Sequence, residues 1–192
     1  GQLKRTVRVI CFGSEEIGLL GAFHHAQSHD PASFRFVMNL DGAGRGKGGN
    51  DVLTLSEWPE LTPWFEQWMK DHEYDFEMKQ QIGPYSDHYP FALRGVPNGT
   101  LNNHELAPGQ VGRGYGHTEA DTLDKIYLRG LQMSSILAAR LALSIANAED
   151  WPAVQMRTDA EVREAVGKAG FLERAVKTGY LPELAEDADK AE

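Results

Sequence analysis

The sequence contains little cysteine, no long apolar run and less positive than negative charge. Its single cysteine, Cys11, excludes a disulfide framework or a multi-thiolate zinc ribbon within these 192 residues. No apolar run reaches the roughly 18 residues of a membrane span. Acidic residues (28) outnumber basic ones (19), and the net charge of −9 disfavours nucleic acid or an anionic membrane surface as a partner. A positively charged partner, such as a metal ion, suits this composition better.

What is present suffices for one folded core. Hydrophobic residues make up 41% of the chain, and a chain of this length buries roughly 70% of the surface that its unfolded form exposes. The first residue is Gly1 rather than methionine, and no secretory signal stands before the first apolar stretch. We therefore expect an excised or processed part of a longer protein.

Apolar periodicity predicts strands that alternate with helices along the chain. The predicted strands cover residues 5–12, 34–40, 51–55 and 99–101, the predicted helices cover 15–28, 61–72, 85–94 and 124–148, and a long loop covers 102–122. Thr158 and Glu161 have the spacing of a capping box at the start of a further helix. The alternation predicts an α/β domain with three layers, α/β/α, around a mostly parallel mixed sheet. We place this α/β domain in residues 1–150 and a helical extension with an acidic tail in residues 151–192.

Acidic side chains follow two of the predicted strands. Glu15 and Glu16 come after the first strand, and Asp41 ends the second. Ligands of open α/β sheets bind at the carboxyl ends of strands, so these positions are candidates for a site. Adjacent carboxylates repel each other unless a cation or a shared proton relieves them. A structural alternative stays open, because acidic residues also stabilise the first turn of a helix through its dipole.

His117 lies in the predicted glycine-rich loop and adds a nitrogen donor. Together with Glu16 and Asp41 it forms a mixed set of two carboxylates and one imidazole, which zinc accepts readily. Spacing along the chain leaves open whether the three side chains converge.

Four strings resemble, in order, successive motifs of the co-catalytic zinc exopeptidases. They are FGSEEIGLLGA at 12–22, FVMNLDGAG at 36–44, YSDHYPFALRGVP at 85–97 and GHTEADTLDKI at 116–126. That family includes zinc aminopeptidases, glutamate carboxypeptidase-like dipeptidases and glutaminyl cyclases. The resemblance extends over residues 5–148 and implies a zinc-exopeptidase-like α/β fold.

The resemblance also implies roles for individual residues. Glu15 would be the general base, Glu16 and His117 would bind one zinc ion, and Asp41 would bind the second. Tyr85 would donate a hydrogen bond to the oxyanion. Residues that would line the pocket or support the ligands are Ser86, Asp87, His88 and Asp121.

One expected motif has no match in this sequence. Family members carry an upstream His-x-Asp motif, whose histidine binds one zinc ion and whose aspartate bridges both. None of the fourteen residues before Glu15 supplies it, and His24, His25 and His29 on the following helix are poor substitutes. We therefore expect a catalytic domain truncated at its N-terminal side and inactive alone. It would hold one zinc ion or none, where the complete enzyme holds two, and its uncovered sheet edge would pair with a second copy.

The resulting hypothesis is a metal-dependent exopeptidase, either an aminopeptidase or a dipeptidase, that hydrolyses short peptides with a zinc-activated water. Two alternatives stay open: a single-zinc acyltransferase of the glutaminyl cyclase type, and a noncatalytic family member. The resemblance implies an extracytoplasmic or secreted location. The sequence leaves open the preferred side chain, the terminus attacked, the physiological metal and the oligomeric state.

Overall fold

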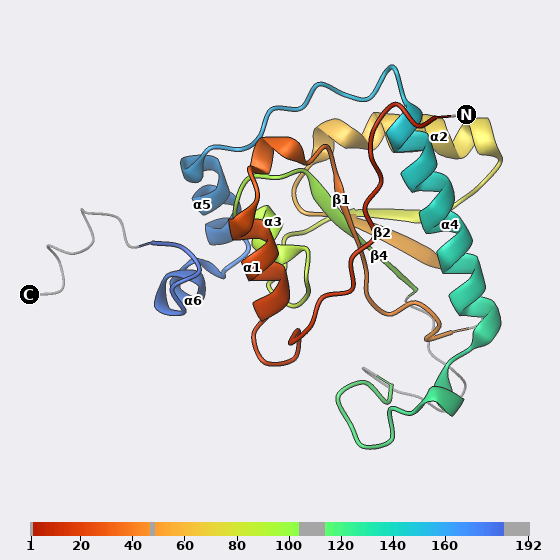
Figure 1. Ribbon diagram of the computed structural model, residues 1–192, viewed down its shortest axis with the longest axis horizontal. Helices are drawn as coiled ribbons and strands as arrows, with labels where there is room; N and C mark the ends of the chain where they lie inside the picture. The colour runs from red at the N-terminus through yellow and green to blue at the C-terminus, as the bar shows by residue number, and fades with distance from the viewer. Residues whose placement is uncertain (1, 47–48, 104–113, 183–192) are drawn as a thin grey trace, which may run out of the picture. The chain divides into compact units, whose positions relative to one another are not determined.

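The computed structural model describes residues 2–46, 49–103 and 114–182 of the chain. It divides into two compact units, each built from segments far apart in sequence (Figure 1). The sheet unit comprises Gly1–Cys11, Met38–Gln80 and Gly99–Val154, and the helical unit comprises Phe12–Val37, Gln81–Asn98 and Gln155–Glu192. The predicted division at residue 150 follows chain order instead, and it stays a prediction. The predicted acidic tail and residues 104–113 of the predicted loop lie outside the described residues.

The sheet unit is built on a four-stranded sheet with the order β1-β4-β2-β3. The strands are β1 (Val37–Leu40), β2 (Asp51–Leu55), β3 (Glu77–Gln80) and β4 (Asn98–Asn103). Strand β2 runs parallel to β3, with Leu53 opposite Met78, and antiparallel to β4, with Leu53 opposite Leu101. The sheet is mixed and mostly parallel, so the predicted α/β class is confirmed.

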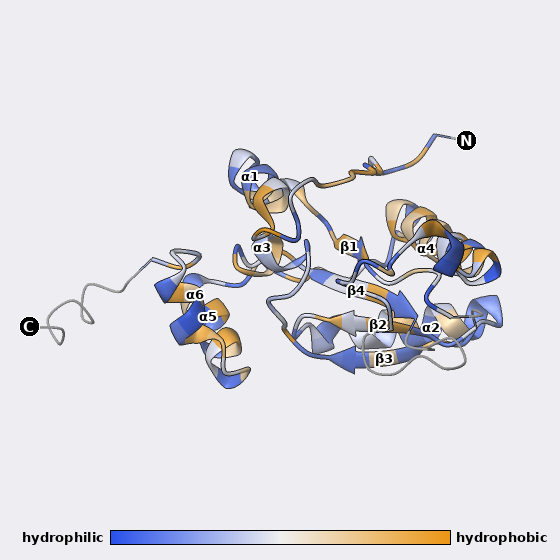
Figure 2. Cartoon of the chain, turned by 90° about the horizontal axis from the view of Figure 1, so that it is seen from below, coloured by the Kyte–Doolittle hydropathy of each residue, from blue (hydrophilic) through white to orange (hydrophobic). Residues whose placement is uncertain are grey.

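Strand β2 is buried along most of its length. Leu53 and Leu55 are fully buried, as expected for an apolar strand with neighbours on both edges. Strand β3 lies at the edge, where exposed Glu77 and Lys79 alternate with half-buried neighbours, and it is drawn mostly in hydrophilic blue in Figure 2. Charged side chains on an edge strand discourage unwanted strand pairing.

Two long amphipathic helices complete the sheet unit, and both were predicted. Helix α2 (Thr62–His72) buries Phe65 and Trp68, and helix α4 (Leu128–Asn147) buries an apolar stripe that includes Leu137 and Leu141. The indole nitrogen of Trp68 donates to the Ser144 hydroxyl at 2.8 Å, which ties the two helices together. Helix α4 begins later than predicted, because a separate 3₁₀ turn occupies Leu123–Lys125.

The helical unit consists of short helices around two apolar clusters. Its helices are α1 (Leu20–Ser28), α3 (Tyr89–Ala92), α5 (Asp159–Lys168) and α6 (Leu172–Lys177), with a 3₁₀ turn at Pro31–Ser33. The predicted capping box is confirmed at α5: the Thr158 backbone N–H donates to the Glu161 carboxylate at 2.7 Å, and the Glu161 N–H donates to the Thr158 hydroxyl at 3.4 Å. Helix α6 was not predicted.

The predicted strand at residues 5–12 is wrong. The segment is irregular and mostly exposed, and Val9 is 89% exposed. Apolar alternation indicates that a segment can form a strand, but a strand needs a hydrogen-bonded neighbour, and no strand among the described residues pairs with it. Arg5 donates instead to the backbone carbonyls of Ile145 and Ala148 at the end of α4. Across the described ranges, no helix is both long and apolar enough to cross a membrane.

Candidate active site

Glu15 and Glu16 lie on a tight turn, residues 14–19, which we call the Glu turn. The predicted helix over 15–28 is wrong in its first part, because α1 begins only at Leu20. The backbone N–H groups of Gly18 and Leu19 both donate to the Glu15 carbonyl, at 3.0 and 2.9 Å. The first turn of α1 contains no acidic residue. The helix-dipole explanation of this carboxylate pair therefore loses its basis.

The Glu turn is bounded by two strained residues. Ser14 and Leu19 have φ values of 62° and 57°, in the left-handed region that non-glycine residues seldom adopt. Such a conformation costs about 1–3 kcal/mol and persists only where surrounding structure enforces it. Two features hold this turn in place. Leu19 is buried in an apolar cluster, and the backbone approaches closely at Gly21, where a Cβ atom would lie 2.6 Å from the Gly13 carbonyl oxygen. Strain of this kind clusters at functional sites.

The two carboxylates of the Glu turn differ in their surroundings. Glu15 is half-buried, whereas Glu16 is exposed. A half-buried carboxylate is held in a restricted set of positions, as a general base requires, and an exposed one can reach an ion in solution. The difference agrees with the two roles that the resemblance implies, and it does not test them.

Asp41 directly follows β1 and is exposed, at the carboxyl end of a strand as predicted. The loop after it approaches the start of α4 closely at Gly44, whose carbonyl accepts from the Tyr127 N–H at 2.9 Å. A Cβ atom on Gly44 would lie 3.0 Å from a methyl group of Ile126, and φ is +81° there, so glycine is needed for the approach. This contact ties the Asp41 loop to the segment that leads into α4.

His117 lies in that same part of the sheet unit, on the turn before α4. Its φ of 65° is also left-handed, and its side chain is exposed. The turn is closed by the Thr118 N–H, which donates to the Tyr115 carbonyl at 3.1 Å, and by the Asp121 N–H, which donates to Thr118. Asp121 is exposed on this turn. Asp41 and His117 thus both belong to segments that converge on the start of α4.

The Tyr85–His88 segment precedes α3 in the helical unit. Ser86 and His88 are buried, Asp87 is half-buried and Tyr85 is 62% exposed. The phenol ring of Tyr85 meets Phe171 edge-on at 5.9 Å, and the Arg174 guanidinium lies over it at 5.6 Å. An exposed phenol held on two sides can present its hydroxyl to a ligand.

The predicted site residues are divided between the two units. Asp41, His117 and Asp121 belong to the sheet unit, whereas Glu15, Glu16 and the Tyr85–His88 segment belong to the helical unit. Their oxygen and nitrogen donors fit zinc chemically. Within residues 2–46, 49–103 and 114–182, no group of three or more His, Cys, Asp or Glu side chains is arranged to hold a metal ion. The predicted ligand set stays a prediction.

Sequence reasoning missed the residues of the C-terminal segment that touch this region. Phe171 and Arg174 contact Tyr85, and the Tyr180 hydroxyl donates to the Gly18 carbonyl of the Glu turn at 3.3 Å. These partners are separated by about 90 to 160 residues, so no local pattern could have paired them. The available signal was compositional: aromatic and basic residues recur in a stretch that we assigned to a helical extension.

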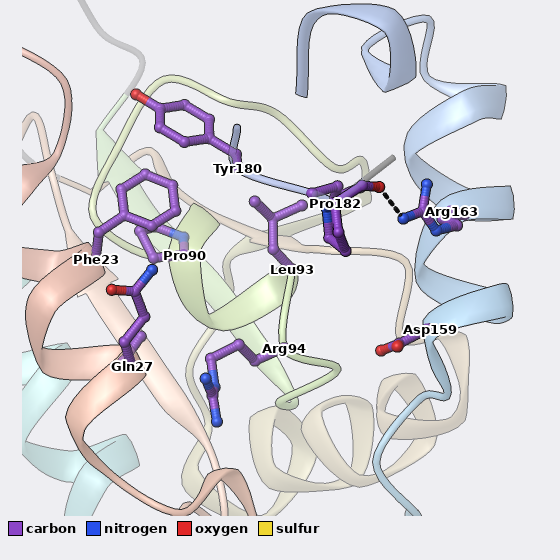
Figure 3. Close-up of a pocket in the computed structure, with 11 residues that line it drawn as sticks. Phe23, Gln27, Pro90, Leu93, Arg94, Asp159, Arg163, Tyr180 and Pro182 are labelled. Atoms are coloured by element: carbon purple, nitrogen blue, oxygen red, sulfur yellow. Dashed lines mark hydrogen bonds between the residues drawn. The ribbon is translucent and has the colours of Figure 1, made fainter. Parts of the chain in front are cut away.

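A separate cavity of about 190 Å³ lies elsewhere in the helical unit (Figure 3). Its walls come from α1, α3, α5 and the Tyr180–Pro182 segment, and Arg163 donates to the Pro182 carbonyl at its edge. None of the predicted site residues lines it. The cavity therefore gives no support to the predicted chemistry.

The four-stranded mixed sheet and the helices that accompany it define the chain as an α/β protein. The model of Peptidase family M28 matches residues 1–142. The chain belongs to this family. No curated protein matches the chain.

Solved structures share the fold at low sequence identity. A Peptidase M28 precursor from Shewanella amazonensis SB2B is 24% identical, with a TM-score of 0.61, over 82% of this chain and 34% of its own. The LapA aminopeptidase of Legionella pneumophila is 19% identical (TM-score 0.58; 72% and 38% covered), and the zinc aminopeptidase BSAP of Bacillus subtilis is 21% identical (TM-score 0.52; 74% and 38% covered). The chain thus spans little more than a third of each of these proteins.

Proposed function

We propose that the protein is a metal-dependent exopeptidase, an aminopeptidase or dipeptidase that hydrolyses short peptides. The observation that carries the proposal is the Glu turn: two adjacent carboxylates held between strained residues in a chain of the M28 family. Its neighbours in fold include aminopeptidases from Legionella pneumophila and Bacillus subtilis. Their low identity supports the shared fold, and the activity of this protein is our inference.

Glu15 is the proposed general base. Its half-buried carboxylate accepts a proton from the attacking water and later delivers that proton to the amine nitrogen that leaves when the peptide bond breaks. One residue can serve both steps because the proton taken in the first is the proton returned in the second. The turn restricts the backbone from which the Glu15 carboxylate projects, and general-base catalysis depends on the direction of that carboxylate.

Zinc is the proposed metal, as in the aminopeptidase BSAP. Glu16, Asp41 and His117 are its proposed ligands in this chain, and two ions are proposed for the complete enzyme. When bound, zinc lowers the pKa of a water molecule to near neutrality and polarises a carbonyl group. Exposed carboxylate and imidazole side chains are suited to exchange water for a metal ion.

The remaining predicted residues take supporting roles in this proposal. The Tyr85 hydroxyl donates a hydrogen bond to the oxygen that gains negative charge when water attacks the peptide carbonyl. Ser86, Asp87 and His88 shape the wall beside it, and Asp121 supports the turn that carries His117. The exposure of Tyr85 is what makes its hydroxyl available to a substrate.

Replacing Glu15 with glutamine tests the proposal. Glutamine keeps the size of the side chain but cannot accept the proton, so we expect kcat to fall by about 10²–10⁴-fold. Zinc content, measured by atomic absorption, should stay at the wild-type level, whereas Glu16→Gln should reduce it. Hydrolysis that survives Glu15→Gln unchanged would exclude the general-base role.

A second copy of the chain is the proposed macromolecular partner. Residues 5–12 present Val7, Val9 and Ile10 to solvent without a neighbouring strand in the described part of the chain. Pairing with the same segment or a sheet edge of another copy would supply the missing backbone hydrogen bonds and cover these side chains. Analytical ultracentrifugation should show a dimer, and a folded monomer at all concentrations would contradict this.

A further inference from the structure

The C-terminal segment 171–180 lies outside residues 1–142, which match the M28 family, yet it contacts both segments of the helical unit that carry proposed catalytic residues. On the Glu turn, the Tyr180 hydroxyl donates to the Gly18 carbonyl. The Tyr180 ring also stacks on Phe23 of α1, with ring centres 4.2 Å apart. A segment beyond the family match is therefore fixed beside the proposed base.

A shared apolar cluster holds this segment in place. Leu19 at the end of the Glu turn packs in one cluster with Tyr89 of α3, Ala175 of α6 and Leu181. All four are less than 9% exposed. Burial of such side chains is worth roughly 1.5–3 kcal/mol for a large aliphatic residue. The position of α6 relative to the Glu turn is thus determined by the core of the helical unit and does not depend on surface contacts.

Arg174 is the side chain that this arrangement brings to Tyr85. Its guanidinium lies over the exposed ring at 5.6 Å, and Phe171 supports the ring from its edge. Arg174 is itself exposed. Burial raises the pKa of the neighbouring Tyr89 hydroxyl to about 12, and the positive charge of Arg174 acts against that rise. The charge of Arg174 is therefore felt on α3 as well as at Tyr85.

A guanidinium group in this position suits one class of ligand. Its planar fork binds a carboxylate through two parallel hydrogen bonds, and stacking on an aromatic ring orients the fork. Successive Cα atoms of a peptide are about 3.8 Å apart. The Arg174 guanidinium lies 5.6 Å from the centre of the Tyr85 ring, whose hydroxyl is proposed to contact the scissile carbonyl. In a dipeptide, the terminal carboxylate belongs to the residue directly after that carbonyl.

We propose that Arg174 binds the carboxylate of the substrate and makes the protein selective for short peptides with a free carboxyl terminus close to the scissile bond. This inference rests on the proposed peptidase function and goes further by assigning the substrate class. The carboxylate can come from the chain terminus or from an acidic side chain. The terminus is the source that we favour, because an exopeptidase acting on a dipeptide always places one there.

Matched peptides test the inference. The first pair of probes is leucylglycine and leucylglycinamide, which differ only in the terminal carboxylate. The second pair is the α-amides of leucylglutamate and leucylglutamine, which differ only in the side-chain carboxylate. We expect the wild-type protein to prefer leucylglycine over its amide by about tenfold or more in kcat/KM, mainly through KM. Arg174→Gln should abolish this preference, because kcat/KM should fall more for leucylglycine than for its amide, and Arg174→Lys should partly restore it.

Lys177→Gln is the matched control, because it removes the same charge from the exposed surface of the same helix. It should keep the preference for the free acid. If Arg174→Gln lowers kcat/KM equally for the acid and the amide, Arg174 has a structural role and the inference is wrong. If the wild type prefers only the peptide with the glutamate side chain, the carboxylate that Arg174 binds is not that of the chain terminus.

A binding experiment separates failure of this inference from failure of the proposed function. Calorimetric titration of wild type and Arg174→Gln with leucylglycine and its amide reports carboxylate recognition without turnover. Hydrolysis of the amide with no acid preference would leave the peptidase function standing and reject the role of Arg174. Absence of all hydrolysis by the complete enzyme would reject the peptidase function. The titration would then decide the role of Arg174: weaker binding of leucylglycine by the variant supports it, and equal binding rejects it.

Discussion

The sheet unit and the helical unit present their polar side chains in different ways. In the sheet unit, Asp41 and His117 stand exposed on loops beside long, regular elements with a buried central strand. In the helical unit, Glu15 is half-buried on a turn between two residues with left-handed backbones. His117 also has a left-handed backbone, with a φ of 65°, so the two units differ in burial and not in the presence of backbone strain. The short helices of the helical unit bury Leu19 of the Glu turn by packing, whereas the turn of His117 is exposed. The general base is thus proposed on a half-buried side chain, and the ligands on exposed ones.

Contacts from distant parts of the chain stabilise the strained residue Leu19 in the helical unit. Leu19 has an unfavourable backbone conformation but is 6% exposed in a cluster that includes residues from α3, α5 and α6. The sheet unit has no comparable dependence on the C-terminal segment, because its strands and helices come from residues before 154. Loss of the C-terminal segment is therefore expected to disturb the Glu turn before it disturbs the sheet.

The largest effect should come from truncating a core leucine in each unit. Leu141→Ala in α4 and Leu93→Ala after α3 remove matched side chains that are 0% and 6% exposed. Each should lower the free energy of unfolding by about 2–5 kcal/mol, with the larger loss at Leu141. Hydrogen exchange should show lost protection in α2, α4 and β2 for the first, and in α1 and α5 for the second.

A surface control and one contradicting outcome make this comparison testable. A surface control, Leu143→Ala, at a position that is 50% exposed on the same helix, should cost far less than Leu141→Ala. If both core variants lose protection from hydrogen exchange equally throughout the described residues, the two units unfold together and are not stabilised separately.

Local patterns predicted the sheet unit well. Strand β2 has the predicted bounds, and α2 begins within one residue of its predicted start, because burial against a sheet leaves a clear period along the sequence. Periodicity failed at residues 5–12, since it indicates which side chains prefer burial and not which strand will pair with them. It failed again at Leu19, because backbone strain there is enforced by contacts in space.

The candidate site was predictable only in part. Residue order and the family resemblance predicted Glu15, Glu16, Asp41 and His117 as site residues, and these roles stay predictions. The structure shows the first two on a strained turn and the others on exposed loops. Arg174 could not be identified in this way. Its relevance comes from a position over Tyr85, 89 residues earlier in the chain, which is produced only by packing of the helical unit.

A buried carboxyl group gives the sheet unit a dependence on pH. Asp51 is 2% exposed, and its Oδ1 accepts from the Ser134 hydroxyl at 2.8 Å, while its Oδ2 has no hydrogen-bond partner among the described residues. Burial raises the pKa of Asp51 above 3.8, and the Ser134 hydrogen bond opposes part of the rise. The folded state therefore holds the proton more tightly than the unfolded chain. The contribution of this group to the free energy of unfolding is complete below pH 3.8, and it is lost as the pH rises through the pKa of the folded state.

Asp51→Asn should remove that dependence, because an amide does not ionise. Above the folded pKa of Asp51 we expect the variant to be at least as stable as the wild type, and the slope of unfolding free energy against pH to flatten on the acid side. Urea unfolding at pH values from 3 to 8 measures both. Ser134→Ala is the informative partner variant: it should steepen the slope by raising the pKa further. An unchanged slope in Asp51→Asn would mean that other groups set the pH dependence of the sheet unit.

The smallest effect should come from the cap of α5, which belongs to the helical unit alone. The Thr158 hydroxyl accepts from the backbone N–H three residues later, so Thr158→Ala leaves one helix donor without its partner. The expected cost is about 1 kcal/mol in the free energy of unfolding. Thr158→Ser keeps the hydroxyl and should lose much less.

The same variant tests whether α5 supports the Glu turn. Because Val162 and Val166 of α5 pack in the cluster that also buries Leu19, hydrogen exchange in the Thr158→Ala variant should accelerate at the Gly18 and Leu19 amides as well as in α5. Acceleration confined to α5 would show that the Glu turn is held without help from the C-terminal helices. It would contradict the proposed dependence of the Glu turn on contacts from distant parts of the chain.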